Sequence, residues 1–201
     1  MLNIVLKPHT ALFIGPTDCG KTQLLLDLLE NEYRHHFEFI FIICSTIDIN
    51  RSYLDKKWVW NDERIICVKP EEKLLKWLKL IQRDFGNRDI LIIFNDIIAD
   101  KNLDKRRSEI ITLSSFGRHK HHSLWMVTQS YTAIPTHLRR QKKMVFCFRL
   151  DHKSDLKFLD EETNVIDDLE QVKKQLEQTE YSFLFINLKW PRGYKVLRND
   201  S

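Results

Sequence analysis

The sequence predicts an α/β fold, in which a mostly parallel central sheet is flanked by helices, because short apolar runs alternate with segments of helical periodicity. The runs are continuous and rich in Ile, Val and Phe, which is typical of strands buried on both faces. They occupy residues 11–14, 39–44, 90–94, 124–128 and 145–150. A glycine-bearing loop between the first run and an apolar helix is a further observation in favour of this class.

Length and composition favour one domain made in a reducing compartment. The chain has 201 residues, of which 43% are hydrophobic and 11% aromatic, enough for a core. We expect a single domain over 1–201, with its core at about 9–150 and a C-terminal segment at 151–201. The longest apolar stretch is far shorter than the roughly 20 residues of a membrane span, and the start does not resemble a signal peptide. The four cysteines are scattered, so we expect no structural disulfides.

The first strand leads into a loop with the spacing G-x-x-x-x-G-K-[ST], which cradles phosphates in nucleotide-binding proteins. Its residues are Gly15, Pro16, Thr17, Asp18, Cys19, Gly20, Lys21 and Thr22. The glycines let backbone N–H groups curl around phosphates, and the helix predicted at 22–30 directs its positive end toward them. We expect Lys21 to reach the β- and γ-phosphates of ATP and Thr22 to bind Mg²⁺. This loop predicts a P-loop NTPase.

The second strand, 39–44, is followed by a polar stretch, 45–64, which we interpret as a loop or insertion. It leads to a short strand predicted at 65–68. Apolar residues at helical spacing then predict a helix over 71–85.

Asn95 and Asp96 end the strand predicted at 90–94. A carboxylate at the carboxyl end of a strand lies beside the ligand in open α/β sheets. Many NTPases place two acidic residues here, one for Mg²⁺ and one for the attacking water. We therefore expect Asp96 to hold the water shell of the metal, to act as the base, or to do both.

A helix predicted over 105–116 precedes the strand 124–128, which ends at Gln129. A polar side chain at this strand end suits a sensor that hydrogen-bonds the attacking water or the γ-phosphate. The alternative is an ordinary strand-to-loop glutamine.

Two basic clusters, 118–122 and 139–143, are candidate phosphate-contacting patches, with solvated loops as the alternative. Arg118 is a candidate for reaching into the site of a neighbouring subunit, where an arginine stabilises charge on the transferred phosphoryl group. Arg139, Arg140 and Arg149 are the other candidates. Beyond these clusters, we expect a charged helical region at 153–179 and a terminal hairpin of strands at 181–188 and 193–197.

These motifs together resemble the FtsK–HerA superfamily of ring-forming, DNA-translocating ATPases, and most closely the genome-packaging ATPases of poxviruses, giant viruses and virophages. The resemblance covers roughly residues 9–150. It rests on GPTDCGKT at 15–22, IIFND at 92–96 and FGRHKHHSLWMVTQ at 116–129, with the I-P and L-R pairs that follow.

The resemblance implies a RecA/ASCE-like P-loop fold. It also implies an ATPase that binds ATP and Mg²⁺ through Lys21, Thr22 and Asp96, with Gln129 as the sensor and Arg118 as the preferred trans-acting arginine. It also implies a hexameric or pentameric ring that moves double-stranded DNA into a capsid. The partners would be the DNA and a capsid or portal-vertex protein, without a membrane, at a virion-assembly site in the host cytoplasm or nucleus. Candidate contacts to the DNA backbone are residues 97–104 and Arg139, Arg140, Lys142 and Lys143.

Two departures from the family pattern concern the metal. Asn95 stands where the family usually has an acidic residue, and Asp18 stands where a small residue is more common. Other interpretations are a helicase-like ATPase or a small-molecule kinase. A third is a nucleotide-binding interaction protein that hydrolyses little, which Asn95 motivates.

Overall fold

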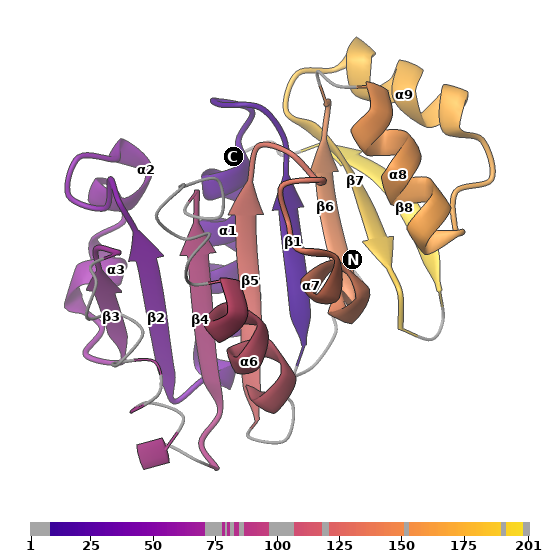
Figure 1. The fold of residues 1–201 in the computed structure, drawn as a ribbon. Helices are drawn as coiled ribbons and strands as arrows, with labels where there is room; N and C mark the ends of the chain where they lie inside the picture. The colour runs from indigo at the N-terminus through magenta and orange to yellow at the C-terminus, as the bar shows by residue number, and fades with distance from the viewer. Residues whose placement is uncertain are drawn as a thin grey trace.

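One sheet of eight strands runs through the chain in the order β3-β2-β4-β5-β1-β6-β7-β8 (Figure 1). The computed structural model describes residues 9–70, 78, 80, 83–84, 87–96, 107–117, 121–150, 153–189 and 192–198. The strands are β1 Thr10–Ile14, β2 Phe39–Cys44, β3 Ile65–Val68, β4 Ile90–Asn95, β5 His122–Thr128, β6 Met144–Phe148, β7 Ser182–Asn187 and β8 Gly193–Arg198. Each predicted strand is present, with ends that differ by one or two residues.

The first six strands in chain order are parallel, and the last two are not. β1 pairs in parallel with β5 on one side and β6 on the other, while β4 pairs with β2 and β5. β7 is antiparallel to β6, and β8 is antiparallel to β7. The predicted α/β fold with a mostly parallel sheet and a C-terminal hairpin is therefore confirmed.

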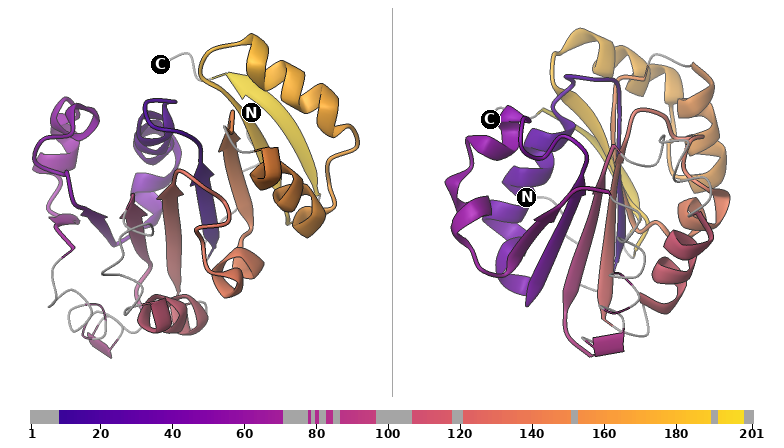
Figure 2. Two further views of the ribbon diagram at one scale, coloured as in Figure 1. Left: turned by 45° about the horizontal axis from the view of Figure 1, so that its top comes forward. Right: turned by 60° about the vertical axis from the view of Figure 1, so that its left-hand side comes forward.

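The helices cover both faces of the sheet (Figure 2). They are α1 Lys21–Leu28, the π-helix η1 Leu29–Tyr33, the 3₁₀-helix η2 Arg34–His36, α2 Arg51–Leu54, α3 Lys57–Asn61, α6 Arg107–Gly117, α7 Thr136–Gln141, α8 Lys153–Thr163 and α9 Leu169–Gln178. α1, η1, α2 and α3 contribute buried residues to one face, and α6 to α9 to the other. None of these described helices is long and apolar enough to cross a membrane.

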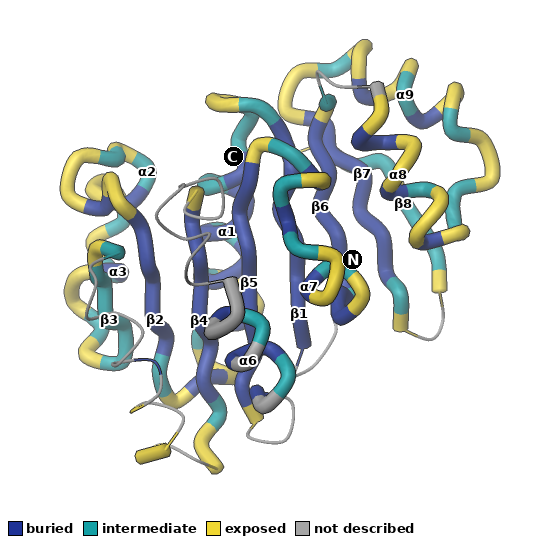
Figure 3. The backbone as a smooth tube through the Cα atoms, in the orientation of Figure 1, coloured by how far each residue is buried: buried dark blue, intermediate teal, exposed yellow. Residues whose placement is uncertain are grey.

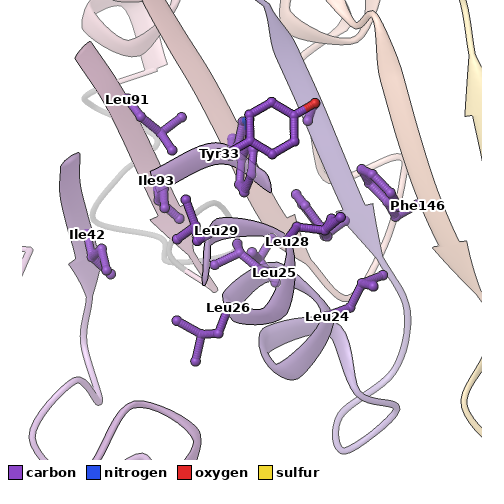
Figure 4. Close-up of a cluster of buried hydrophobic side chains, with 14 of the residues drawn as sticks. Leu24, Leu25, Leu26, Leu28, Leu29, Tyr33, Ile42, Leu91, Ile93 and Phe146 are labelled. Atoms are coloured by element: carbon purple, nitrogen blue, oxygen red, sulfur yellow. The ribbon is translucent and has the colours of Figure 1, made fainter. Parts of the chain in front are cut away.

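The alternation of side chains along each strand divides the core between these two faces. Leu12 and Ile14 pack on the side of α6 to α9, whereas Ala11 and Phe13 pack on the side of α1. Figure 3 shows the central strands buried along their length, with exposed residues on the outer helices and turns. Figure 4 shows how the leucines of α1 and η1 fill the space over β2, β4 and β6. Burial on both faces explains why the strands are apolar runs without alternation.

Residues 45–64 are more regular than the predicted loop or insertion, since they contain α2 and α3. Asn50 caps α2 by accepting a hydrogen bond from the Ser52 N–H. Such a cap marks the start of a helix, but a search for apolar residues at helical spacing does not detect it. α7 is also absent from our prediction, because six residues are too few for a helical pattern. The helix predicted over 71–85 lies largely, and the candidate loop 97–104 wholly, outside the described residues.

Candidate nucleotide-binding site

The carboxyl ends of β1, β4 and β5 bring the predicted site residues to one edge of the sheet. Ile14 is paired with Thr128, and Asn95 with Val127, so the segments after these strands begin side by side. Backbone hydrogen bonds continue the register, because the Gly15 N–H donates to the Thr128 carbonyl at 3.2 Å and the Asp96 N–H to the Val127 carbonyl at 3.1 Å. This edge is where open α/β sheets bind their ligands.

The loop Gly15–Thr22 needs its two glycines for different reasons. A Cβ at Gly15 would lie 2.7 Å from both Cys19 Sγ and Phe148 Cβ, so the loop can pass β6 only without a side chain there. Gly20 caps α1 with a φ of 94°, in the left-handed region that suits glycine. The loop thereby turns directly into the N-terminus of α1, whose free N–H groups favour an anion.

The Lys21 ammonium lies folded over the loop. Its residue is only 5% exposed, and its Nζ donates to the Pro16 carbonyl and lies 3.8 Å from Cys19 Sγ. Among the described residues, no carboxylate forms a salt bridge with this ammonium. A buried cation without a salt bridge fits an anionic ligand, because the ligand would supply a negative charge in direct contact with it.

Asn95 lies behind Thr22, where a metal ion would be bound. Its Nδ2 donates to the Tyr53 hydroxyl at 2.8 Å and lies 3.5 Å from Thr22 Oγ1. Asn95 is 1% exposed, yet its Oδ1 has no hydrogen-bond partner among the described residues. Thr22, Asp96 and this unpartnered amide oxygen are the oxygen groups at this end of the site that suit Mg²⁺, which binds oxygen ligands and keeps several waters. The atom that Asn95 turns toward Thr22 is its Nδ2. Tyr53, from α2, is a site residue that the sequence analysis missed.

Asp96 has a left-handed backbone conformation, with φ 53°, at the turn after β4. Its side chain reaches solvent, but the surrounding protein removes part of its hydration. This desolvation raises the pKa of the Asp96 carboxyl above its usual range, and the nearby Lys21 ammonium opposes the effect. A raised pKa makes the carboxylate a better proton acceptor, as a general base requires.

Gln129 follows β5 at the same edge. It is exposed, and its side chain forms no hydrogen bond with the other described residues. The turn that carries it is fixed locally, because the Thr128 hydroxyl donates to the Ser130 carbonyl at 3.3 Å. Gln129 is thus free to meet a ligand from a fixed backbone.

Asp155 of α8 holds the residues that follow Gln129. The carboxylate is buried and accepts four hydrogen bonds, from the Ser130 hydroxyl at 2.7 Å, the Tyr131 N–H at 2.9 Å, and the Thr132 hydroxyl and N–H at 2.9 and 3.4 Å. Sequence analysis missed Asp155, because one acid among many in a charged helical region carries no signal of its own.

The basic segment 139–143 is only partly available to a partner. Arg139 and Lys142 lie 3.1 and 3.3 Å from the carboxylate oxygens of Glu162, and both lie over the Tyr131 ring. The Tyr131 hydroxyl also donates to Glu162. Arg140 is exposed and Lys143 is half-buried. DNA contact by this segment stays a prediction, in which Arg139 and Lys142 would have to leave or share their ion pairs with Glu162. Arg118 lies outside the described residues.

Comparison with known proteins places the chain in a family. The model of the poxvirus A32 protein family matches residues 3–181. The chain belongs to this family. Membership confirms the predicted viral genome-packaging ATPase of the FtsK–HerA type. The comparison with curated proteins gives no match.

Solved structures support the fold. The genome packaging NTPase B204 from Sulfolobus turreted icosahedral virus 2, in complex with AMPPCP, is 14% identical with a TM-score of 0.64, covering 94% of this chain and 97% of that one. B204 from Sulfolobus turreted icosahedral virus, a DNA-packaging ATPase, is 15% identical with a TM-score of 0.65, covering 96% and 98%. The pCW3 conjugation coupling protein TcpA, with ATPγS, is 15% identical with a TM-score of 0.59, covering 94% and 59%. At these identities the likeness shows the α/β fold of P-loop NTPases alone.

Proposed function

We propose that this genome-packaging ATPase hydrolyses Mg²⁺-bound ATP at the loop Gly15–Thr22 and uses the energy to move double-stranded DNA. The observation that carries the proposal is the buried Lys21 ammonium, which forms no salt bridge with a carboxylate of the described residues. It lies at the same sheet edge as Asp96 and as Asn95, whose Oδ1 has no partner among those residues. A triphosphate would supply negative charge to the Lys21 ammonium, and its metal ion would supply a partner for the oxygens of Asn95 and Asp96. The likeness to B204, whose structure holds an ATP analogue, supports this ligand.

The residues divide the reaction between them. The backbone N–H groups of the loop and Lys21 bind and orient the phosphates, and the positive charge of Lys21 stabilises the charge that develops during transfer. Mg²⁺, held by Thr22 and through water by Asn95 and Asp96, would neutralise phosphate charge. Asp96 accepts the proton of the attacking water, and Gln129 orients that water.

A ring of identical subunits couples ATP hydrolysis to the movement of DNA. Arg118 of one subunit would reach the site of the next, so that hydrolysis in one subunit changes its grip on its neighbour. Arg139, Arg140, Lys142 and Lys143 are candidate contacts for the DNA backbone, where binding would be independent of sequence and weakened by salt. A capsid or portal-vertex protein would bind the ring at the site of virion assembly.

A second function, nucleotide binding with little hydrolysis, is favoured by one observation. Asn95 occupies the position beside Thr22, so that the end of β4 supplies one carboxylate, Asp96, where two are usual. One carboxylate attracts Mg²⁺ less strongly than two.

Turnover of Mg²⁺-ATP, measured with and without long double-stranded DNA, separates the two functions. We expect hydrolysis that DNA stimulates, and no hydrolysis by the Lys21→Ala variant. Lys69→Ala, which removes an exposed lysine paired with Asp48, is the matched control and should behave as the parent. Tight ATP binding with negligible turnover in either condition would contradict the motor and favour the second function.

A further inference from the structure

The C-terminal part of the chain, beyond the sequence motifs at 9–150, forms one wall of a cavity beside the phosphate loop. The cavity has a volume of about 280 Å³. One side of the cavity is lined by the phosphate-loop residues Pro16, Thr17, Asp18 and Cys19. The other side is lined by the end of α9, the connection that follows it and the start of β7, through Leu176, Glu177, Thr179, Glu180, Tyr181 and Ser182. The strand register brings the phosphate loop close to the start of β7. Ile14, the last residue before the loop, pairs with Cys147, and the next residue of β6, Phe148, pairs with Phe183.

The position of the cavity relative to Asp96 is informative. β4 and Asp96 lie on the β5 side of β1, whereas β6, β7 and the cavity lie on its other side. A nucleotide whose terminal phosphate is directed toward Asp96 would therefore extend its other end away from Asp96, into the cavity. The volume is close to the lower end of the range for small-molecule sites, which suits part of a ligand whose phosphates lie outside it.

Tyr181 is the most unusual residue of this wall. Its φ of 59° is rare for an aromatic residue, and it is 48% exposed. Its ring lies over the phosphate loop, because Cδ1 is 3.3 Å from the position of a Cβ at Gly20. A strained backbone that holds an exposed aromatic ring against a ligand loop points to contact with a ligand.

The remaining polar groups of the wall suit a nucleoside. Glu177, Glu180 and Arg149 lie around the cavity and are exposed. Carboxylates accept hydrogen bonds from hydroxyl and amino groups, such as those of a ribose or a base. A second phosphate site is disfavoured, because Asp18 and the two glutamates would repel it.

We propose that this cavity binds the nucleoside half of the ATP, with the base stacked on the Tyr181 ring. The proposal rests on the proposed function of the phosphate loop and adds to it the residues that distinguish a nucleotide from a bare polyphosphate. The C-terminal segment thereby becomes part of the nucleotide site.

Binding of ATP and of inorganic tripolyphosphate, each with Mg²⁺, tests this by calorimetry. Tyr181→Ala is expected to weaken ATP binding about tenfold, the usual order for a lost base–aromatic stack, and to leave tripolyphosphate binding unchanged. Tyr181→Phe should bind as the parent does. Phe158→Ala, which truncates an aromatic residue that is 47% exposed on α8, is the matched control.

Two results would overturn the nucleoside site. One is equal loss of ATP and tripolyphosphate affinity in Tyr181→Ala, which would mean that the ring only supports the loop. The other is an unchanged affinity for ATP. If the parent protein binds neither ligand, the proposed function of the loop itself fails, and the nucleoside site fails with it.

A different observation, the buried Asp155 carboxylate with its four hydrogen bonds, carries a second inference. These bonds attach α8 to residues 130–132, directly after Gln129, and Glu162 of the same helix holds Tyr131. We infer that Asp155 is a positioning residue, which fixes the turn from which Gln129 reaches the attacking water. Like the first proposal, it rests on the proposed function.

A double-mutant cycle on turnover tests the role of Asp155. Asp155→Asn keeps the shape but loses acceptor capacity, and we expect kcat to fall about 10- to 100-fold while KM for ATP changes little. In a Gln129→Ala background the same change should have no further effect on kcat. Asp160→Asn, on the same helix, is the control. A lower melting temperature with kcat of the folded protein unchanged would overturn the inference, as would additive effects of the two substitutions.

Discussion

At the scale of single residues, the site combines groups that are strained or unpaired before a ligand binds. Asp18 and Asp96 both have left-handed backbone conformations. Among the described residues, the buried Lys21 forms no salt bridge and Asn95 Oδ1 has no hydrogen-bond partner. Such features reduce the stability of the free protein and become favourable when the ligand is present. Two substitutions test this at the metal end of the site.

Asp96→Asn is expected to abolish turnover and to stabilise the protein without ligand. The pKa of Asp96 is raised in the folded state, so the folded state holds the proton more tightly than the unfolded state does. The free energy of unfolding therefore falls as the pH rises from the ordinary pKa of an aspartate through the raised one, and the loss remains at neutral pH. The neutral amide removes this pH-dependent loss. Thermal melts from pH 3 to 7 check the prediction, and a variant less stable than the parent at pH 7 would contradict it.

Turnover of the parent should also fall as the pH is lowered through the raised pKa of Asp96, because the protonated carboxyl cannot accept a proton. The midpoint of the pH–rate profile is expected above the usual range of an aspartate. A profile that remains flat down to the ordinary pKa would argue against Asp96 as the base.

Asn95→Asp is expected to lower the Mg²⁺ concentration needed for half-maximal ATPase activity. The change places a second carboxylate beside Thr22, and the Tyr53 hydroxyl can donate to it. Asn164→Asp, at an exposed position, is the control. An unchanged or higher Mg²⁺ requirement would mean that Asn95 does not face the metal.

At the scale of secondary-structure elements, much of the fold could be predicted from the sequence. The strands are buried on both faces, so nearly every residue in them is apolar, and the runs mark their bounds to within one or two residues. The phosphate loop and the ends of β4 and β5 follow from spacing alone. The short helices α2 and α7, and the contacts of Tyr53 and Asp155, depend on packing between distant segments. No local pattern reports such contacts.

Gly15→Ala tests the packing of the phosphate loop against β6. The new Cβ would lie 2.7 Å from Phe148 Cβ, an atom fixed by its strand, so the strand or the loop must move. We expect the free energy of unfolding to fall by about 1–3 kcal/mol, as in other overpacked cores. Gly193→Ala is the control, because a Cβ there meets nothing within 4 Å, and its effect should stay within about 0.5 kcal/mol. Equal effects of the two substitutions in denaturant melts would contradict this account.

At the scale of the whole molecule, the sheet joins the nucleotide edge to the C-terminal segment. β1 and β6 are neighbours, β6 continues into the hairpin β7–β8, and α8 holds the turn after β5. Sequence analysis could not assign a role to 151–201, because the residues that contact the site lie singly among charged residues. The structure shows that this segment contacts both the phosphate loop and the turn of Gln129.

In the proposed ring, Arg118 is the candidate arginine that would reach the site of the next subunit. Arg118→Ala is expected to abolish hydrolysis, because the arginine completes the site of a neighbour. Mixing it with Lys21→Ala subunits should restore part of the activity, since a ring then contains intact loops next to intact arginines. Turnover measured across mixing ratios checks this. Failure of every mixture to exceed either variant alone would argue against a trans-acting role.

The central claim, that ATP hydrolysis at Gly15–Thr22 moves DNA, is tested most directly by displacement of a triplex-forming oligonucleotide from a long DNA duplex. The account predicts displacement that requires Mg²⁺-ATP, rises with time and is absent for Lys21→Ala. Robust DNA-dependent ATP hydrolysis without displacement of the third strand would contradict it.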